Sequence, residues 1–216
     1  EHTLSWKIKQ SKHCDQLFIL PGNAGTTKLG ENINLNPNDF EKVKDLVIEK
    51  NIGLVVVGPE EPLVNGIVDY FESQSELKNV NIFGPSKEGA QLEGSKDFSK
   101  DFMFRNKIPC ANSKTFNKKN IEEGFNFLEE ISPPYVLKAD GLAAGKGVLI
   151  LDNIKEAKRE LNEMLINKKF GEASRSVLIE EFLDGIEVSI FFITDGKGYV
   201  LLPEAKDYKR IGDGDK

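Results

Sequence analysis

The chain has 216 residues, a formal net charge of −6 at pH 7 and a pI near 5.2. This length allows one large or two small domains, and the acidic balance without a lysine-rich block argues against a nucleic-acid-binding surface. Cys14 and Cys110 form no C-x-x-C pair, which indicates a reducing compartment, and the apolar runs are too short to span a membrane. Since no signal peptide precedes Glu1, we expect a cytoplasmic protein.

The first half of the sequence alternates helix and strand patterns. Helices are expected at residues 1–10, 39–51 and 63–73, and strands at 16–20, 52–57 and 80–83. The continuous apolar run at 52–57 is typical of a strand that a parallel sheet buries on both faces. These elements predict a doubly wound parallel sheet. Because the pattern opens on a helix, we expect the first strand of that sheet to be missing.

Turns follow the predicted strands at residues 21–27 (P-G-N-A-G-T-T), 58–61 and 84–86. Ligands of parallel α/β sheets bind beyond the carboxyl ends of the strands, so we expect these turns to share one rim. Asn23 with Gly22 and Gly25 is compatible with a nest of backbone N–H groups for a sugar phosphate. It is equally compatible with an ordinary tight turn, and both interpretations stay open.

The second half of the sequence predicts a smaller unit that contains both helices and strands. We expect a long helix at 87–106, further helices at 121–131 and 155–165, and strands at 113–116, 135–137, 148–151, 177–182, 187–194 and 199–202. The helix at 155–165 should bury Ala157, Leu161, Met164 and Leu165.

The most informative stretch is V-L-K-A-D-G-L-A-A-G-K-G-V-L-I-L, at residues 136–151. Glycines let backbone N–H groups face an anion, and Lys138 and Lys146 add point charges, so the pattern predicts a hairpin lid over a polyphosphate. A Walker A loop is excluded because Gly147 follows Lys146 and a strand pattern, not a helix, comes next. The alternative is a glycine-rich hairpin with solvated lysines.

Charged residues near this hairpin suggest further contacts with a nucleotide. Glu180 and Glu181 end one strand and Glu187 opens the next, where carboxylates could accept from an adenine amino group and from ribose hydroxyls. An ordinary edge hairpin with solvated acids is the alternative. Lys96 and Lys100 lie one helical turn apart, either as a cationic face toward the phosphates or as solvated lysines.

A last charged cluster comprises Asp207, Lys209, Arg210, Asp213 and Asp215. It could bind a charged substrate, because arginine suits bidentate contacts to carboxylate or phosphate. A solvated tail is the alternative.

Several blocks together resemble the phosphoribosylamine–glycine ligase family of the ATP-grasp superfamily, in its N-terminal portion. They are P-G-N-A-G-T (21–26), V-V-G-P-E-x-P-L-V (56–64), I-F-G-P-S (82–86), A-Q-L-E-G-S-K-x-F-S-K-D-F (90–102), K-A-D-G-L-A-A-G-K-G-V (138–148), E-E-F-L-D-G-x-E (180–187) and D-Y-K-R-I-G-D-G-D (207–215). The resemblance implies an α/β and α+β fold. It divides the chain into a Rossmann-like pre-ATP-grasp domain with a connecting helix (1–110), the ATP-grasp lid subdomain (111–180) and the start of the second subdomain (181–216).

The resemblance also implies a reaction: ligation of glycine to 5-phosphoribosylamine through a glycyl phosphate, driven by ATP with Mg²⁺ or Mn²⁺, in purine biosynthesis. The residues implied for ATP are Lys96, Lys138, Gly141, Gly145, Lys146, Gly147, Glu180, Glu181, Phe182, Leu183 and Glu187. Those implied for the other substrates are Pro21, Gly22, Asn23, Ala24, Gly25, Thr26, Gly58, Pro59, Glu60, Asp207, Lys209, Arg210 and Asp213. No catalytic side chain is assigned.

Two departures from the family pattern matter. Of the family's opening G-x-G-G-R-E turn, this sequence has only Glu1 and His2. The metal ligands are expected beyond Lys216, so we expect these residues alone to be catalytically inactive. We further expect a monomer with no nucleic-acid or membrane partner. A non-catalytic nucleotide-binding module is the alternative function, and a dinucleotide-binding dehydrogenase domain is a second one that no intact G-x-G-x-x-G supports.

Overall fold

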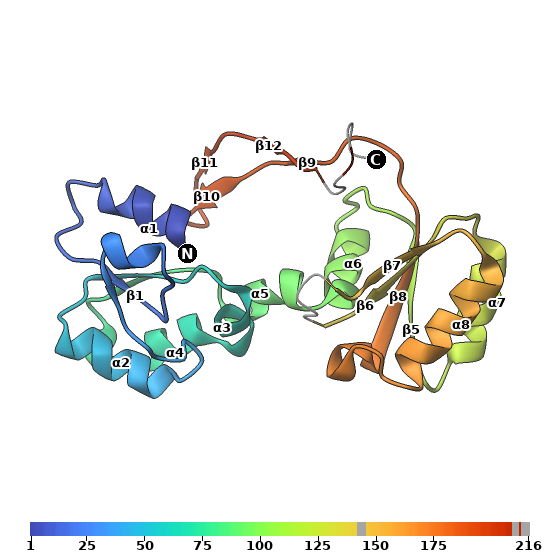
Figure 1. The fold of residues 1–216 in the computed structure, drawn as a ribbon, viewed down its shortest axis with the longest axis horizontal. Helices are drawn as coiled ribbons and strands as arrows, with labels where there is room; N and C mark the ends of the chain where they lie inside the picture. Colours follow the sequence, from blue (N-terminus) through green and yellow to red (C-terminus); the bar gives the residue numbers. More distant parts are fainter. Residues whose placement is uncertain (142–145, 209–211, 213–216) are drawn as a thin grey trace.

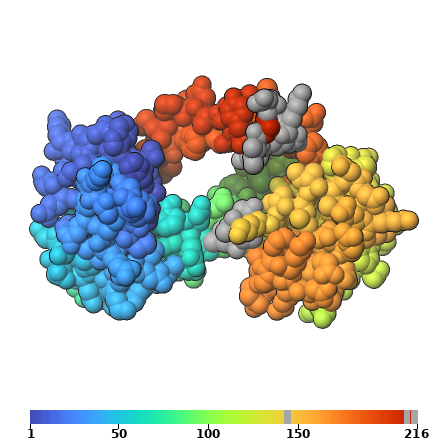
Figure 2. All heavy atoms as spheres, viewed as in Figure 1, coloured from blue at the N-terminus to red at the C-terminus, as the bar shows by residue number. Residues whose placement is uncertain are grey.

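The structure is a computed structural model that describes residues 1–141, 146–208 and 212. Figure 1 shows two lobes connected through the helices α5 (Lys87–Gly94) and α6 (Lys96–Arg105). An arm built from β9 to β12 leaves the second lobe and extends back toward α1 (His2–Lys9) in the first. Figure 2 shows open space between the two lobes and this arm.

The first lobe contains short parallel strands flanked by helices. β1 (Phe18–Ile19) pairs with β2 (Glu31–Asn32), and β3 (Leu54–Val56) pairs with β4 (Asn81–Phe83). Both pairs are parallel, as predicted, but among the described residues they form two separate two-stranded sheets. β2 was not predicted, because a strand of two residues carries no periodic signal.

The core of the first lobe lies on one face of β3 and β4. It is formed mainly by α2 (Phe40–Glu49) and α4 (Ile67–Ser73). Its buried members are Val43, Val47, Ile67, Val68, Phe71 and Leu77. On the opposite face Leu54 is 58% exposed and Phe83 47% exposed, so the prediction that residues 52–57 are buried on both faces is wrong. Apolar composition identifies the strand, but neighbouring elements decide which of its faces is covered.

Two helices that were predicted to be continuous are each divided into two. α3 (Glu60–Asn65) ends at Gly66, whose φ of +96° is left-handed, and α4 begins after it. α5 and α6 are separated by Ser95, which is extended and whose hydroxyl accepts a hydrogen bond from Phe98 N. Ser95 is therefore the N-cap of a new helix, a role for which serine is favoured.

The second lobe is an antiparallel sheet covered by two helices on one face. The strand order is β5 (Ser113–Asn117), β8 (Ser176–Glu181), β6 (Tyr135–Ala139) and β7 (Val148–Leu151). β6 and β7 pair antiparallel, which confirms the predicted hairpin. The helices α7 (Ile121–Glu130) and α8 (Ile154–Leu165) pack on the face that carries Leu137 and Ile179.

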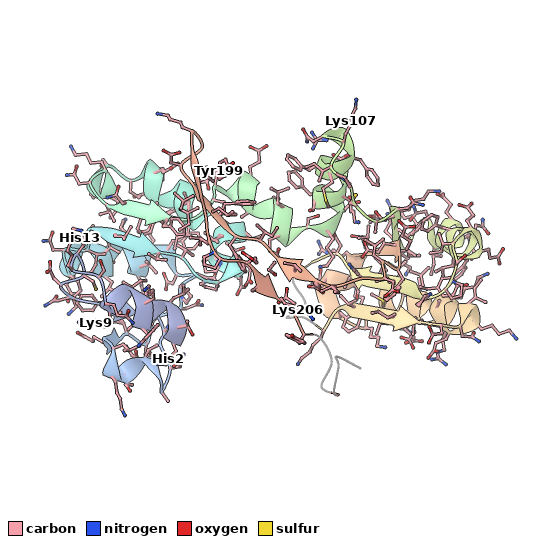
Figure 3. All side chains as sticks on the ribbon, turned by 90° about the horizontal axis from the view of Figure 1, so that it is seen from above. His2, Lys9, His13, Lys107, Tyr199 and Lys206 are labelled. Carbon is pink, nitrogen blue, oxygen red and sulfur yellow. The ribbon has the colours of Figure 1, made fainter. Side chains whose placement is uncertain are left out.

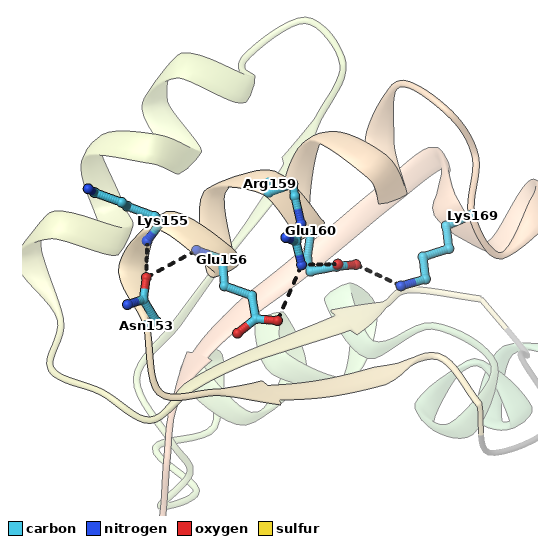
Figure 4. A network of polar contacts seen from close by, with 6 residues as sticks. All are labelled: Asn153, Lys155, Glu156, Arg159, Glu160 and Lys169. Atoms are coloured by element: carbon cyan, nitrogen blue, oxygen red, sulfur yellow. Dashed lines mark hydrogen bonds and ion pairs between the residues drawn. The ribbon is translucent and has the colours of Figure 1, made fainter.

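The α8 helix is amphipathic, as predicted. Its four expected core residues, Ala157, Leu161, Met164 and Leu165, are all buried. Its outer surface carries a polar network (Figure 4), in which the Asn153 side chain accepts from Lys155 N and Glu156 N, and Glu160 pairs with Arg159 and Lys169. The helix thus presents an apolar face to the core and a charged face to solvent.

The arm consists of two short antiparallel pairs. β9 (Val188–Ser189) pairs with β12 (Ala205–Lys206), and β10 (Phe192–Thr194) pairs with β11 (Tyr199–Leu201). The strand predicted at 187–194 is therefore divided in two, and residues 195–198 form the turn between β10 and β11. Figure 3 shows Tyr199 and Lys206 on this arm, apart from His2 and Lys9 on α1. No helix among the described residues is long and apolar enough to cross a membrane.

Candidate functional site

A buried cluster of charges lies on the sheet face opposite α7 and α8. Glu180 on β8 stands opposite Val136 on β6, and Lys138 lies two residues further along the same face of β6. Glu180 Oε1 pairs with Lys138 Nζ, and Glu180 Oε2 lies 2.9 Å from Lys100 Nζ of α6. We call this group the Lys100–Glu180–Lys138 cluster.

The cluster is ionised and carries excess positive charge. Burial alone would raise the pKa of Glu180, but the hydrogen bonds and charges of Lys138 and Lys100 outweigh burial and hold its pKa below the ordinary value. Glu180 is therefore a carboxylate at neutral pH, and the cluster of two ammonium groups and one carboxylate has a net charge of about +1. Such a site favours an anionic ligand.

A second polar cluster fixes the start of the glycine-rich turn. Asp140 follows β6, and its carboxylate accepts from Asp97 N at 2.9 Å and from the hydroxyls of Ser95 and Ser176, each at 3.3 Å. Lys96 Nζ lies 3.4 Å from the carbonyl oxygens of both Asp140 and Gly141. The first turn of α6 is thereby attached to the end of β6.

These contacts bring Lys96 and Lys138 to the base of the glycine-rich turn, and Lys100 is joined to Lys138 through Glu180. The base is closed by a hydrogen bond from Ala139 N to Gly147 O at 2.8 Å, and Lys146 beside it is exposed. A Cβ on Gly141 would lie 3.2 Å from Ala173 Cα, so the backbone of Gly141 packs closely against Ala173. Gly145, also predicted to contact phosphate, lies outside the described residues. Ammonium groups around a glycine turn are the donors that a polyphosphate needs.

The predicted adenine-binding segment follows β8 without a break. Glu181 Oε1 accepts from Asn112 N at 2.9 Å, and Glu181 N donates to Asn112 O at 3.0 Å, which ties β8 to the segment before β5. Glu181 and Phe182 line a hollow of about 430 Å³ together with the turn at 131–134. Leu183 is 64% exposed, and Glu187, also exposed, accepts from Asp207 N through its carbonyl.

The turn at residues 21–26 is held together by its own hydrogen bonds. Thr26 is buried, and its hydroxyl accepts from Asn23 N at 2.9 Å, while Asn32 Nδ2 donates to Asn23 O at 3.0 Å. Gly22 has a φ of +80°, and a Cβ there would lie 2.3 Å from Asn32 Cγ. Pro21 and Ala24 on the same turn are exposed. These internal hydrogen bonds favour the tight-turn interpretation. The turn nevertheless follows β1, at the carboxyl end of a parallel strand, where a ligand-binding turn was expected.

The other predicted substrate turn lies close to the first because both contact α1. A Cβ on Gly25 would lie 3.1 Å from His2 Cδ2, and a Cβ on Gly58 would lie 3.6 Å from Leu4 Cδ1. Pro59 and Glu60 then form the start of α3. Since β3 and β4 are parallel neighbours, the turn after β4 lies beside Gly58 at the same edge.

The predicted charged loop near the chain's end is described only in part. Asp207 accepts from the Ser189 hydroxyl at 2.6 Å, which places it on the arm. Lys209, Arg210 and Asp213 lie outside the described residues. Within the described part of the chain, no group of three or more His, Cys, Asp or Glu residues could hold a metal ion.

Sequence reasoning missed several residues of this site. Asp140, Ser95, Ser176 and Asn112 were not selected, and Lys100 was weighed only as part of a cationic helix face. The partners of Asp140 are 36 to 45 residues away in sequence, so no local pattern reveals them. The available signal was a carboxylate placed directly before a glycine-rich turn.

Two family models together match the whole chain. "Phosphoribosylglycinamide synthetase, N domain" matches residues 1–93, and "Phosphoribosylglycinamide synthetase, ATP-grasp (A) domain" matches residues 94–216. The chain belongs to the phosphoribosylglycinamide synthetase family. This confirms the family and the fold class that the sequence motifs implied.

Relatives within the phosphoribosylglycinamide synthetase family match over the full length of this chain. A phosphoribosylamine–glycine ligase of Haemophilus influenzae is 45% identical, with 100% of this chain and 49% of that protein covered. A bifunctional purine biosynthetic protein of Pichia angusta is 46% identical, with 100% of this chain and 27% of that protein covered. The chain spans about half the length of the single-function ligases that it matches.

Solved structures give the same result for the fold. The phosphoribosylamine–glycine ligase of Thermotoga maritima has a TM-score of 0.80 and 34% identity, with 100% of this chain and 49% of that chain covered. The biotin carboxylase domain of Hydrogenobacter thermophilus 2-oxoglutarate carboxylase has a TM-score of 0.70 at 22% identity, with 97% of this chain and 48% of that chain covered. At that identity only the ATP-grasp fold is shared.

Proposed function

We propose that this chain is the N-terminal, ATP-binding portion of a phosphoribosylamine–glycine ligase of purine biosynthesis. The observation that carries the proposal is that Lys96 and Lys138 meet at the base of the glycine-rich turn, with Lys100 joined to Lys138 through Glu180. It occurs in a chain that family models of this synthetase match from end to end. A purely non-catalytic nucleotide-binding module would need the same cationic site, so activity must separate the two.

In the proposed reaction the γ-phosphoryl group of ATP passes to the carboxylate of glycine and gives glycyl phosphate and ADP. The amine of 5-phosphoribosylamine then attacks the acyl carbon and releases phosphate, with glycinamide ribonucleotide as product. Phosphoryl transfer depends mainly on positioning and on stabilising charge, which lysines and backbone N–H groups supply. No nucleophilic side chain of the protein is required.

The proposed roles follow the geometry of the site. Lys96, Lys138, Lys146 and the glycines 141, 145 and 147 contact the phosphates. Glu180, Glu181 and the Phe182–Leu183 backbone form the adenine segment, and Glu187 accepts from the ribose. What supports the adenine assignment is that Glu181 and Phe182 line a hollow at the end of the strand that also carries Glu180.

The remaining substrate contacts are assigned to two regions. The turns containing Pro21–Thr26 and Gly58–Glu60 are proposed to bind phosphoribosylamine, since both lie against α1 at one edge of the first lobe. The segment from Asp207 through Lys209, Arg210 and Asp213 is proposed to face a charged substrate.

Magnesium or manganese belongs to the proposed reaction, but the described residues do not fit a metal site. No described cluster supplies enough carboxylate or imidazole ligands, so we derive no step through a metal ion and expect its ligands beyond Lys216. For the protein as a whole we also propose a cytoplasmic location, a monomeric state, and subdomain boundaries near residues 110 and 180.

The test is phosphate release by the complete protein that carries this chain, with glycine or phosphoribosylamine omitted in turn. We expect release only when ATP and both substrates are present, and none from residues 1–216 alone. Lys138→Met should lower kcat/KM by at least about 100-fold, because it removes a charge at the phosphates. The matched control is Lys158→Met on α8, whose 32%-exposed ammonium pairs with Glu129. Phosphate release that does not depend on glycine, or full activity of Lys138→Met, would contradict the proposal.

A further inference from the structure

The two lysines that share Glu180 are held in unequal ways. Lys100 is 13% exposed, and its ammonium has two oxygen partners, Glu180 Oε2 at 2.9 Å and Ala111 O at 3.0 Å. Lys138 is 29% exposed, and Glu180 Oε1 is its partner among the described residues. Lys138 can therefore leave Glu180 more readily than Lys100 can.

We infer that Lys100 is a positioning residue that keeps the Glu180 carboxylate charged and in place when Lys138 moves from it to a nucleotide phosphate. The inference rests on the proposed function, because it assumes that Lys138 binds ATP. Lys100 would then act through Glu180 and need not touch the nucleotide. Lys100 keeps its ion pair with Glu180 while a nucleotide phosphate replaces Glu180 as the partner of Lys138.

The physical argument concerns a buried carboxylate. Glu180 is 6% exposed, and removing its last ionic partner would leave an uncompensated charge, which is strongly unfavourable. The groups that face it are Lys100 from α6, Lys138 from β6 and the uncharged hydroxyl of Ser113, which stands opposite it on β5. That hydroxyl is buried and has no hydrogen-bond partner in the described structure. Lys100 is thus the group that can keep Glu180 ionised once Lys138 has moved.

Removing Lys100 should couple ATP binding to a proton. In Lys100→Met, movement of Lys138 to the phosphate would leave Glu180 buried and unpaired, so its pKa would rise and it would take up a proton. ATP affinity should then fall by at least about tenfold at neutral pH and recover as the pH is lowered. The wild-type protein should show little of this proton uptake, because Lys100 stays paired.

The experiment is calorimetric titration of the complete protein with ATP, at several pH values and in two buffers of different ionisation enthalpy. The variants are Lys100→Met, Glu180→Gln and the double variant, with Lys114→Met as the matched control. Lys114 is on β5, 58% exposed and 3.7 Å from Glu130, so its loss should leave ATP binding unchanged. In the Glu180→Gln background, loss of Lys100 should have no further effect on affinity, since no buried carboxylate remains to be compensated.

Two results would overturn the inference. One is wild-type affinity without proton uptake in Lys100→Met. The other is an equal loss of affinity from Lys100→Met in both backgrounds, which would mean that Lys100 binds the nucleotide directly. If Lys100→Met does not fold, the double variant is compared with Glu180→Gln: equal affinity supports the role, and a further loss refutes it. Failure of the wild-type protein to bind ATP would instead refute the proposed function, and the role of Lys100 with it.

Discussion

Gly22 shows how a single position in a proposed substrate turn is determined by packing. Its φ of +80° is left-handed, and a Cβ would lie 2.3 Å from the Asn32 side chain. Gly22→Ala should therefore destabilise the first lobe by about 1–3 kcal/mol, through backbone strain and displacement of Asn32. The measurement is the melting temperature of the variant, with protection of the Asn23 and Thr26 amides from hydrogen exchange as a local readout.

Gly196 provides the control for this residue. It has nearly the same φ, +82°, but a Cβ there would meet nothing within 4 Å. Gly196→Ala therefore carries the backbone strain without the clash, and should cost less stability than Gly22→Ala. If the two variants lost equal stability, packing against Asn32 would have no part in the requirement for Gly22.

At the scale of elements, α6 is attached to the sheet of the second lobe through Asp140. Asp140→Ala removes the acceptor of Asp97 N and of two serine hydroxyls, and should cost about 1–2 kcal/mol of stability. Asp140→Asn keeps one carbonyl acceptor and should retain part of that contribution. Hydrogen exchange at Asp97 N should rise most in the alanine variant. Unchanged exchange there would show that the Ser95 cap is sufficient for the helix.

The elements that were predicted correctly are those whose signal is contained in one stretch of chain. The 3.6-residue pattern of α8 and the glycine turn between two apolar runs in β6–β7 needed no distant partner. The breaks at Gly66 and Ser95 were missed because each lies in a stretch that otherwise favours helix. A glycine that can adopt positive φ and a serine that can cap were the local signals for both.

The candidate site divides in the same way. Lys138 and the glycine turn could be selected as candidates from sequence because they are neighbours along the chain. The pairing of Glu180 with Lys100 joins residues of α6 and β8, and it depends on how α6 packs on the sheet. The contacts of Asp140 are likewise tertiary, so only a structure could reveal them. The prediction that residues 52–57 are buried on both faces was wrong for the same reason. The exposure of Leu54, and of Phe83 on the neighbouring strand, depends on which elements cover that face.

At the scale of the molecule, the two lobes have separate hydrophobic cores that share no residue. The helices α5 and α6 connect them, and Lys96, Asp97 and Lys100 of α6 make polar contacts with the second lobe. Lobes with independent cores should unfold as separate cooperative units. We therefore expect two transitions when the described chain is heated or denatured.

Substitutions in each core should identify the two transitions. Leu161 is fully buried in the second lobe. Leu161→Ala should therefore lower the free energy of unfolding of that lobe by about 2–5 kcal/mol and leave the transition of the first lobe in place. Phe71 is 3% exposed in the core of the first lobe. Phe71→Ala should lower the free energy of unfolding of the first lobe by about 3–5 kcal/mol and leave the transition of the second lobe in place. Hydrogen exchange assigns each transition, because protection should be lost in α7 and α8 for the first variant and in α2 and α4 for the second. A single transition that both variants shift equally would show that the lobes unfold as one unit, and that the polar contacts of α6 couple them more strongly than their separate cores imply.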